Sequence, residues 1–262
     1  MKKGKKLYEG KAKIIFASAD KNLVIQHFKD DATAFNNKKK GNFEGKGILN
    51  NRISEHILSS LKNVGIENHL IKRLNMREQL IDLADIFPIE FVIRNIATGS
   101  LTKRLNVEDG TILNKPLIEF YYKNDELADP LIAREHIDTF KWASLVELNL
   151  ITEQCLRVND FLQGMFGGIG IKLVDLKLEF GKRKSDGKIL LADEISPDTC
   201  RLWDANTDKK LDKDRFRKNL GNLIEAYQDV ARRLGILHEQ PNIKPIKFIK
   251  PRSVKIKKNN EN

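Results

Sequence analysis

The hydrophobic pattern of the first thirty residues is typical of β-strands. Residues 7–16 and 23–28 are short apolar-rich runs; Gly10 interrupts the first, and a polar segment at 18–20 separates the two. These runs predict an N-terminal antiparallel meander. Residues 36–46 are polar and lie among glycines, so we expect a long mobile loop there rather than a regular element.

Three later segments have the apolar spacing of amphipathic helices. Hydrophobic residues recur every three or four positions over 49–64, 148–162 and 216–234, which places them on one face of each helix. Gly65 follows the first segment at a plausible C-cap position. The glycine-rich segment 164–170 follows the second, and we interpret it as a C-cap and connecting loop in preference to a phosphate-binding loop.

Strand-like runs at 89–95, 171–180 and 188–195 lie among these helices. Because hairpins and helices do not alternate strictly, the pattern favours an α+β fold over a doubly wound sheet. We expect a β-rich N-terminal domain over residues 1–86 and a larger α+β domain over 87–240. Residues 241–262 are basic and rich in proline, which predicts an extended or disordered tail.

The composition is that of a globular protein. The chain has 262 residues, of which 40% are hydrophobic. It contains no run of about 18 apolar residues that would span a membrane, and no apolar signal-peptide core follows its basic start. Two cysteines, Cys155 and Cys200, are too few for a disulfide scaffold and lack zinc-site spacing. We therefore expect a cytoplasmic protein without membrane contact.

The net charge of +11 is concentrated at the two ends of the chain. Residues 1–13 carry +5 and residues 241–262 carry +6, so the residues between them sum to zero. A domain that binds nucleic acid usually has a basic groove across its fold. The distribution argues against that class, although the basic ends alone keep a nucleic-acid-binding protein open as an alternative.

The first candidate site is the segment Leu-Tyr-Glu-Gly-Lys-Ala-Lys at 7–13. In a strand, Lys11 and Lys13 lie on one face, so two ammonium groups can converge on a polyphosphate near the bend that Gly10 permits. A single glycine is a weaker signal than a full phosphate-binding loop. An ordinary basic surface hairpin fits the segment as well.

The second candidate site is a pair of strands that carry acidic residues. Asp175, Lys177 and Glu179 alternate with apolar residues and share one face of a strand. If a three-residue turn joins this strand to the next, Glu179 lies directly opposite Asp193; a two-residue turn places Phe180 there instead. Opposed carboxylates are destabilising unless a cation lies between them, so the first register predicts a Mg²⁺ site shared with substrate phosphates. A charged surface strand is the alternative.

Two segments bring arginine into turns rich in small residues. Arg94 ends a strand that leads into a turn reaching Ser100, and Arg201 follows the acidic strand after a proline turn. The guanidinium fork suits phosphate or carboxylate, although structural ion pairs explain each segment equally well. Arg217 lies near the start of the last predicted helix, where a cation opposes the helix dipole and hints at an anion nearby.

Other types of site find little support. The five histidines are far apart in the sequence, with no paired spacing that suggests a metal site, and no Ser/His/Asp arrangement is evident.

Taken together, five motifs resemble those of the SAICAR (phosphoribosylaminoimidazole-succinocarboxamide) synthase family. They are LYEGKAK, FPIEFVIRNIATGS, LVDLKLEFG, DEISPDTCRLWD and DKDRFR, and they occur in the order and spacing of the family over roughly residues 5 to 237. The resemblance implies a two-domain α+β fold with a kinase-like nucleotide cleft between the domains. It also implies an ATP-dependent ligase of purine biosynthesis, acting on carboxyaminoimidazole ribonucleotide (CAIR) and L-aspartate, and a homodimer or other homo-oligomer.

The resemblance also implies a role for each motif residue. Its nucleotide-binding residues would be Gly10, Lys11, Ala12, Lys13 and Glu179; Glu179 and Asp193 would hold Mg²⁺; Lys177 and Asp198 would be catalytic; and Arg94, Ser100, Arg201 and Arg217 would bind substrate. ATP would activate the CAIR carboxylate as an acyl phosphate, which needs charge neutralisation but no enzyme nucleophile. A phosphotransferase of the same fold with another acceptor is the remaining alternative.

The chain departs from the family pattern at two positions. Asn36 stands in a loop where many relatives have an acidic residue, and Cys200 stands where relatives often have serine or another small residue. The residues that hold L-aspartate therefore stay undefined by the sequence.

Overall fold

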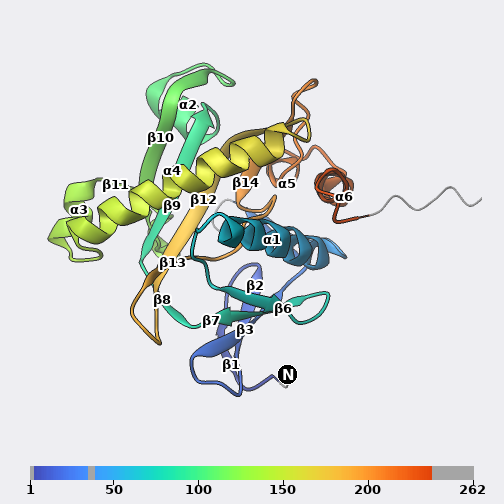
Figure 1. Ribbon diagram of the computed structural model, residues 1–262. Coiled ribbons are helices and arrows are strands. Elements are labelled where there is room, and N and C mark those ends of the chain that lie inside the picture. The colour runs from blue at the N-terminus through green and yellow to red at the C-terminus, as the bar shows by residue number, and fades with distance from the viewer. Residues whose placement is uncertain (1–2, 35–38, 238–262) are drawn as a thin grey trace, which may run out of the picture.

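The fold is built on two antiparallel sheets that lie on either side of a central helix (Figure 1). A computed structural model describes residues 3–34 and 39–237. Antiparallel sheets with helices that do not alternate strictly with strands confirm the predicted α+β class. The expected tail, residues 241–262, lies outside the described residues.

The first sheet contains the predicted N-terminal meander. Its strand order is β1-β2-β3-β7-β6, and in its register Ile15 faces Gln26 and Ile25 faces Leu80. Ile25 and Leu80 are buried, so one side of the sheet supplies part of the core. The strands are β1 (Lys6–Glu9), β2 (Lys13–Ala17), β3 (Leu23–Phe28), β6 (Leu70–Arg73) and β7 (Glu78–Asp82).

A separate hairpin corrects the loop expected at residues 36–46. Strands β4 (Asp31–Ala34) and β5 (Lys39–Asn42) pair with each other, and Lys46 already belongs to the first helix. Residues 35–38 of the expected loop lie outside the described part. The polar composition was misleading because the buried residues of the hairpin, Ala32 and Ala34, lie on β4, while Lys40 and Asn42 on β5 are exposed. The hairpin belongs to neither sheet.

The second sheet is organised around its longest strand, β12 (Ile171–Arg183). Strands β9 and β14 pair with its first half, and β8 and β13 pair with its second half. Strand β9 continues through β10 to β11 at the edge. The remaining strands are β8 (Ala84–Ile86), β9 (Ile89–Ile96), β10 (Ile112–Tyr122), β11 (Leu131–Ile132), β13 (Ile189–Ala192) and β14 (Cys200–Asp204).

Two long helices cover the sheets, as their apolar spacing predicts. Helix α1 (Lys46–Asn63) packs on the first sheet, and Figure 1 shows it between the two sheets. Helix α4 (Leu145–Gly167) crosses the second sheet and begins with a capping box between Ser144 and Glu147. The short helices are α2 (Ser100–Leu105), the 3₁₀ turn η1 (Asp125–Leu127), and α3 (Arg134–Thr139).

The last predicted helix, residues 216–234, is two helices in the structure. Helix α5 (Asp214–Arg217) ends after one turn, and α6 (Leu223–Arg233) begins six residues later. Asn219, Gly221 and Asn222 between them have positive φ angles, which an α-helix does not allow. The three-to-four spacing continues across the break, so the periodicity alone did not reveal it.

The described residues contain no helix that is both long enough and apolar enough to cross a membrane. The chain passes from the first sheet to the second between β7 and β8, because β8 already pairs with β12. A short segment also links the sheets directly: the backbone N–H of His69 donates to the carbonyl of Leu191 at 2.9 Å.

Candidate active site

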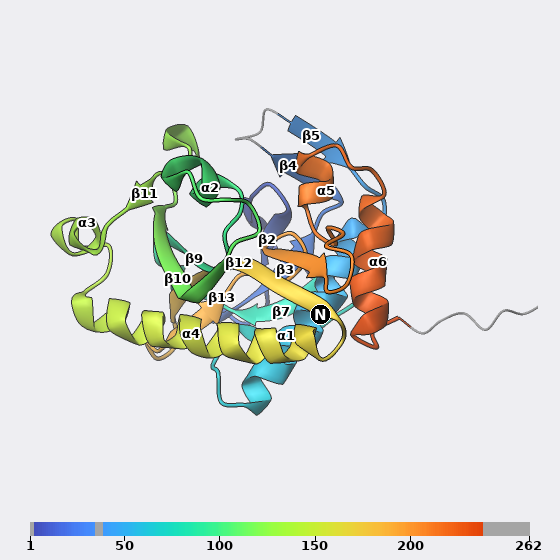
Figure 2. The ribbon, with the colours of Figure 1, turned by 90° about the horizontal axis from the view of Figure 1, so that it is seen from above.

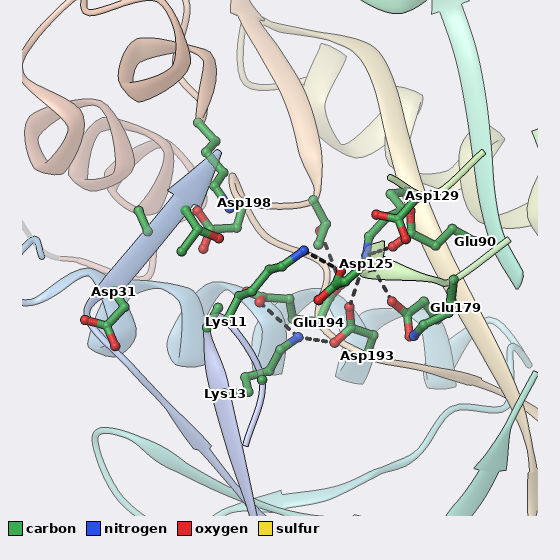
Figure 3. A pocket seen from close by; sticks show the side chains of 18 of the residues that line it. Lys11, Lys13, Asp31, Glu90, Asp125, Asp129, Glu179, Asp193, Glu194 and Asp198 are labelled. Carbon is green, nitrogen blue, oxygen red and sulfur yellow. Dashed lines mark hydrogen bonds and ion pairs between the residues drawn. The ribbon is translucent and has the colours of Figure 1, made fainter. Parts of the chain in front are cut away.

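A cavity of about 1610 Å³ opens between the two sheets. Its walls come from the β1–β2 turn, the β4–β5 hairpin, the strands β9, β10 and β12, and the segment after β13. Figure 3 shows acidic and basic side chains from these separate parts of the chain pointing toward one another. The cavity contains every residue for which the sequence suggested a role: Gly10, Lys11, Ala12, Lys13, Arg94, Ser100, Lys177, Glu179, Asp193, Asp198, Arg201 and Arg217.

The β1–β2 turn carries two lysines across the cavity to the second sheet. The N–H of Gly10 donates to the carbonyl of Lys13 at 2.9 Å, which closes the turn. The Nζ of Lys11 lies 2.6 Å from Asp125, and Lys13 pairs with Asp193 and, at 3.0 Å, with Glu194. Burial opposes the charge of Lys13, but these two carboxylates hold its pKa above the usual value.

Lys177, on β12, lies at the centre of a group of acidic residues from three parts of the chain. Its Nζ is 2.7 Å from Glu90, 2.9 Å from Glu179 and 4.0 Å from Asp193. Burial disfavours the ammonium, but Glu179 and Glu90 hold the pKa of Lys177 well above its usual value. Glu179 also pairs with Lys123; burial would raise the pKa of this carboxyl, and Lys177 and Lys123 lower it instead.

The predicted register of the acidic hairpin is wrong. Four residues rather than three form the turn, because the N–H of Gly187 donates to the carbonyl of Arg183 and Lys182 faces Ile189. Glu179 therefore faces Ala192. Asp193 follows the last paired residue with a φ of 61°, and this left-handed conformation lets its carboxylate approach Lys177. The two carboxylates converge, but by a backbone turn rather than across the ladder.

The protein supplies only some of the oxygen ligands that a magnesium ion near Lys177 would need. Among residues 3–34 and 39–237, no three His, Cys, Asp or Glu side chains are placed to hold a metal. Glu179 and Asp193 supply two carboxylates at one end of the cavity. Mg²⁺ in nucleotide sites is bound through one or two carboxylates and completed by phosphate oxygens and water, so two carboxylates suffice for that ion.

Arg94, Ser100 and Arg201 form a second group in the cavity. The guanidinium of Arg94 donates to Ser100 Oγ at 3.1 Å and to Asp175 at 3.0 Å, and Arg201 donates to the same Asp175 oxygen at 2.6 Å. Gly99 has a φ of 65°, and a Cβ there would lie 2.9 Å from Arg201. The glycine in the predicted turn thus allows the second arginine to approach.

Asp198 is held in place by groups that no motif indicated. Its carboxylate accepts from Lys46 at 2.6 Å, from Asn50 at 3.0 Å and from the Tyr227 hydroxyl at 2.6 Å. The Lys46 side chain has no exposed surface. Burial would raise the pKa of Asp198, but Lys46 holds it far below the usual value. Asp198 therefore stays ionised at neutral pH.

Several charged residues line the cavity although the sequence did not single them out. Glu90 lies four residues before Arg94 on β9, and the two-residue period of a strand places both on the same face. The sequence therefore did contain a signal for Glu90. Lys213 stands in the quoted motif DKDRFR but was given no role, and Lys123 has no local signal and reaches the cavity through tertiary packing. Cys155 and Cys200 are buried free thiols whose pKa values burial raises, which makes them unreactive.

A family model described as SAICAR synthetase matches residues 6–234. Two curated relatives carry the name phosphoribosylaminoimidazole-succinocarboxamide synthase. The protein of Pelagibacter ubique is 68% identical over 260 residues, covering 98% of this chain and 100% of that one. The protein of Rhizorhabdus wittichii is 56% identical over 245 residues, covering 93% and 95%.

Two solved structures that carry the same family name superpose on this chain. The crystal structure of the Ehrlichia chaffeensis synthase superposes with a TM-score of 0.87 at 54% identity, covering 90% of this chain and all of that one. A SAICAR synthetase in complex with ADP superposes with a TM-score of 0.85 at 47% identity, covering 89% and 98%.

Proposed function

Because the chain belongs to the SAICAR synthetase family, we propose that it is the ATP-dependent ligase that joins L-aspartate to the carboxylate of CAIR, releasing SAICAR, ADP and phosphate. The observation that carries the proposal is the meeting of two groups in one cavity. Lys177 lies beside Glu179 and Asp193, and Arg94 and Arg201 lie in the same cavity on Asp175.

The first group has the chemistry to neutralise a transferring phosphoryl group. Lys177 stays protonated at neutral pH, and we assign it to the phosphoryl group. Lys11 and Lys13, on the turn that Gly10 and Ala12 complete, would lie over the triphosphate. Glu179 and Asp193 would hold Mg²⁺, which, when bound, neutralises charge on the phosphates.

The second group suits the phosphate of a ribonucleotide. Arg94 and Arg201 present planar donors, and Ser100 adds a hydroxyl at the start of α2. Asp175 holds both arginines through one oxygen, which keeps their forks oriented. Asp198, anchored by Lys46 and Tyr227, is proposed to contact substrate as a fixed carboxylate, and Arg217, which lines the same cavity, is proposed to contact substrate as well.

The reaction needs no enzyme nucleophile. An oxygen of the CAIR carboxylate attacks the γ-phosphorus of ATP, and the bond from that phosphorus to ADP breaks. The amine of L-aspartate then attacks the carbonyl carbon of the acyl phosphate, and phosphate leaves with the original carboxylate oxygen. The side chains position the reactants and neutralise charge, the usual task of a protein in phosphoryl transfer.

We further propose that the enzyme works in the cytoplasm as a homodimer or other homo-oligomer, as the family resemblance implies. Two buried free thiols with raised pKa values fit a reducing compartment. Light scattering after size-exclusion chromatography tests the assembly; a monomeric mass at working concentration would contradict it.

ADP release tests the proposed function. It is expected to require both CAIR and L-aspartate, and the product is expected to have the mass of SAICAR. A phosphotransferase with another acceptor would release ADP without L-aspartate. A nucleic-acid-binding protein would show no such turnover and would bind RNA or DNA with a steep salt dependence.

A further inference from the structure

Lys13 is held by two carboxylates that differ in their surroundings. Asp193 and Glu194 follow β13 as consecutive residues, and Figure 3 shows the Lys13 ammonium between them. The side chain of Asp193 is 17% exposed and also lies 4.0 Å from Lys177, whereas the side chain of Glu194 is only 2% exposed. Figure 2, seen from above, shows the strand β2 that carries Lys13 beneath the second sheet. Glu194 lines the same cavity but has no part in the proposed reaction.

Both oxygens of Glu194 are directed at groups of the protein. Its Oε1 lies 3.0 Å from the Nζ of Lys13, and its Oε2 accepts a hydrogen bond from the Ser196 hydroxyl at 2.6 Å. Within residues 3–34 and 39–237, Lys13 is the only cation that forms an ion pair with Glu194. A buried charge is stable only when it is paired, so Glu194 and Lys13 hold each other in place.

The turn after β13 fixes the position of Glu194. The Ser196 hydroxyl that donates to Glu194 also accepts from the N–H of Asp198 at 3.1 Å, and the Thr199 hydroxyl donates to the Glu194 carbonyl at 3.2 Å. The side chain and the backbone of Glu194 are therefore both tied to the segment that carries Asp198. The lysine that it contacts is a flexible four-carbon chain, so the carboxylate is the fixed member of the pair.

Asp193 does not fix Lys13 in the same way once the proposed site is filled. The proposed function assigns the carboxylate of Asp193, with that of Glu179, to Mg²⁺. A carboxylate whose charge is shared with a divalent cation attracts an ammonium less strongly. Glu194 has no second task, so it is the acid that stays with Lys13 when the nucleotide is bound.

We propose that Glu194 is a positioning residue, which holds the Lys13 ammonium where it meets the phosphates of the nucleotide and does not itself bind the metal. The inference rests on the proposed function, which places Lys13 over the triphosphate. Without Glu194, Asp193 is the only acid in the described part of the chain that pairs with Lys13. The ammonium would then turn toward the carboxylate that the metal needs.

Calorimetric titration of ADP into Glu194→Gln tests the inference, once with Mg²⁺ and once with a chelator. The Kd for ADP is expected to rise about tenfold in both conditions, because the contact between Lys13 and phosphate requires no metal. Steady-state kinetics are expected to show a matching rise in the KM for ATP and a KM for CAIR close to that of wild type. Glu153→Gln makes the same change at an exposed position of α4 and is expected to leave both KM values and the Kd unchanged.

The Lys13→Met background shows whether Glu194 acts through Lys13. In that background, Glu194→Gln is expected to cause no further loss of ADP affinity. An equal further loss would overturn the inference, because Glu194 would then act by another route. A loss that occurs with Mg²⁺ but not with the chelator would also overturn it, since Glu194 would then be a metal ligand. An unchanged or lower Kd in Glu194→Gln would contradict it as well.

If Glu194→Gln does not fold, Glu194→Asp decides, since it keeps the charge and withdraws it from Lys13 by one methylene. A rise in the Kd for ADP that the Lys13→Met background abolishes supports the inference, and wild-type affinity contradicts it. A wild-type enzyme that binds no ADP would instead contradict the proposed function itself.

Discussion

The charged side chains of the cavity are fixed mainly by one another. Lys177 is held between Glu90 on β9 and Glu179 on β12, and Lys13 is held by Asp193 and Glu194, which follow β13. The raised pKa values of Lys13 and Lys177 keep both lysines protonated at neutral pH, and the lowered pKa values of Glu179 and Asp193 keep these carboxylates ionised. A site that neutralises phosphate charge and holds Mg²⁺ needs both forms.

Neutralising either proposed metal ligand is expected to abolish turnover. Glu179→Gln and Asp193→Asn each remove one of two carboxylates, and we expect ADP release to fall at least 100-fold, about 2.7 kcal/mol in transition-state stabilisation. The fold is expected to stay intact, because Lys177 keeps Glu90. Asp186→Asn, at the turn of the same hairpin, is the control and is expected to stay active. Near-normal activity of either variant would refute the metal assignment.

His69 predicts a pH dependence of stability. Burial lowers its pKa to about 4 from 6.5. The unfolded chain therefore binds a proton below pH 6.5 that the folded protein excludes down to pH 4, so the free energy of unfolding falls as pH decreases through this window, by roughly 3 kcal/mol.

Denaturant unfolding between pH 4 and 7 checks this expectation. His69→Gln is expected to flatten the pH dependence in this window. His56→Gln, which changes an exposed histidine, is expected to leave the slope as in wild type. Equal slopes for His69→Gln and wild type would show that His69 does not make this contribution.

At this scale the sequence identified residues with local signals and missed those without one. Arg94 and Ser100 share one short segment, so their approach was foreseeable. Lys46 and Tyr227 reach Asp198 from 152 and 29 residues away. A lysine at the start of an amphipathic helix is normally solvated, whereas this one is fully buried against Asp198 by tertiary packing.

At the scale of elements, β12 positions the site because its partners change along its length. Its first half lies between β9 and β14, and its second half between β8 and β13. Gly181 lies in the second half, where a Cβ would meet the Asp85 carbonyl at 2.9 Å and Ile86 at 3.0 Å. The close approach of β8 therefore requires a residue without a side chain.

Two glycine substitutions are expected to change stability in opposite directions. Gly181→Ala forces β8 away and is expected to lower the free energy of unfolding by about 1–3 kcal/mol. Gly164→Ala lies inside α4 with no atom within 4 Å of the new Cβ, and is expected to raise it by about 0.5–1 kcal/mol. Urea unfolding measures both. Equal effects of the two variants would contradict the close packing of β8.

The sequence predicted these elements better than their ends. The alternation on β12 was clear from the sequence. The length of the β12–β13 turn was not, because it is set by the hydrogen bond from Gly187 to Arg183. The turn is one residue longer than predicted, which changes which residues of β12 and β13 face each other. The break between α5 and α6 depends on three residues with positive φ, two of them asparagines. Asparagine tolerates this conformation without demanding it, so its presence alone did not predict the break.

At the scale of the whole molecule, the cavity depends on both sheets. Lys11 and Lys13 come from the β1–β2 turn and the start of β2 in the first sheet, and their partners Asp125 and Asp193 lie in η1 after β10 and directly after β13 of the second. The division into residues 1–86 and 87–240 stays a prediction. In the neutral middle of the chain, cavity cations such as Lys177, Arg94 and Arg201 are paired with acids that lie beside them.

Transfer of oxygen from CAIR to phosphate tests the central claim most directly. CAIR labelled with ¹⁸O in its carboxylate is converted with ATP and L-aspartate, and the released phosphate is examined by mass spectrometry. Activation as an acyl phosphate predicts one ¹⁸O atom in each phosphate formed. Phosphate without the label would contradict the account, because the carboxylate oxygen would then not have attacked ATP.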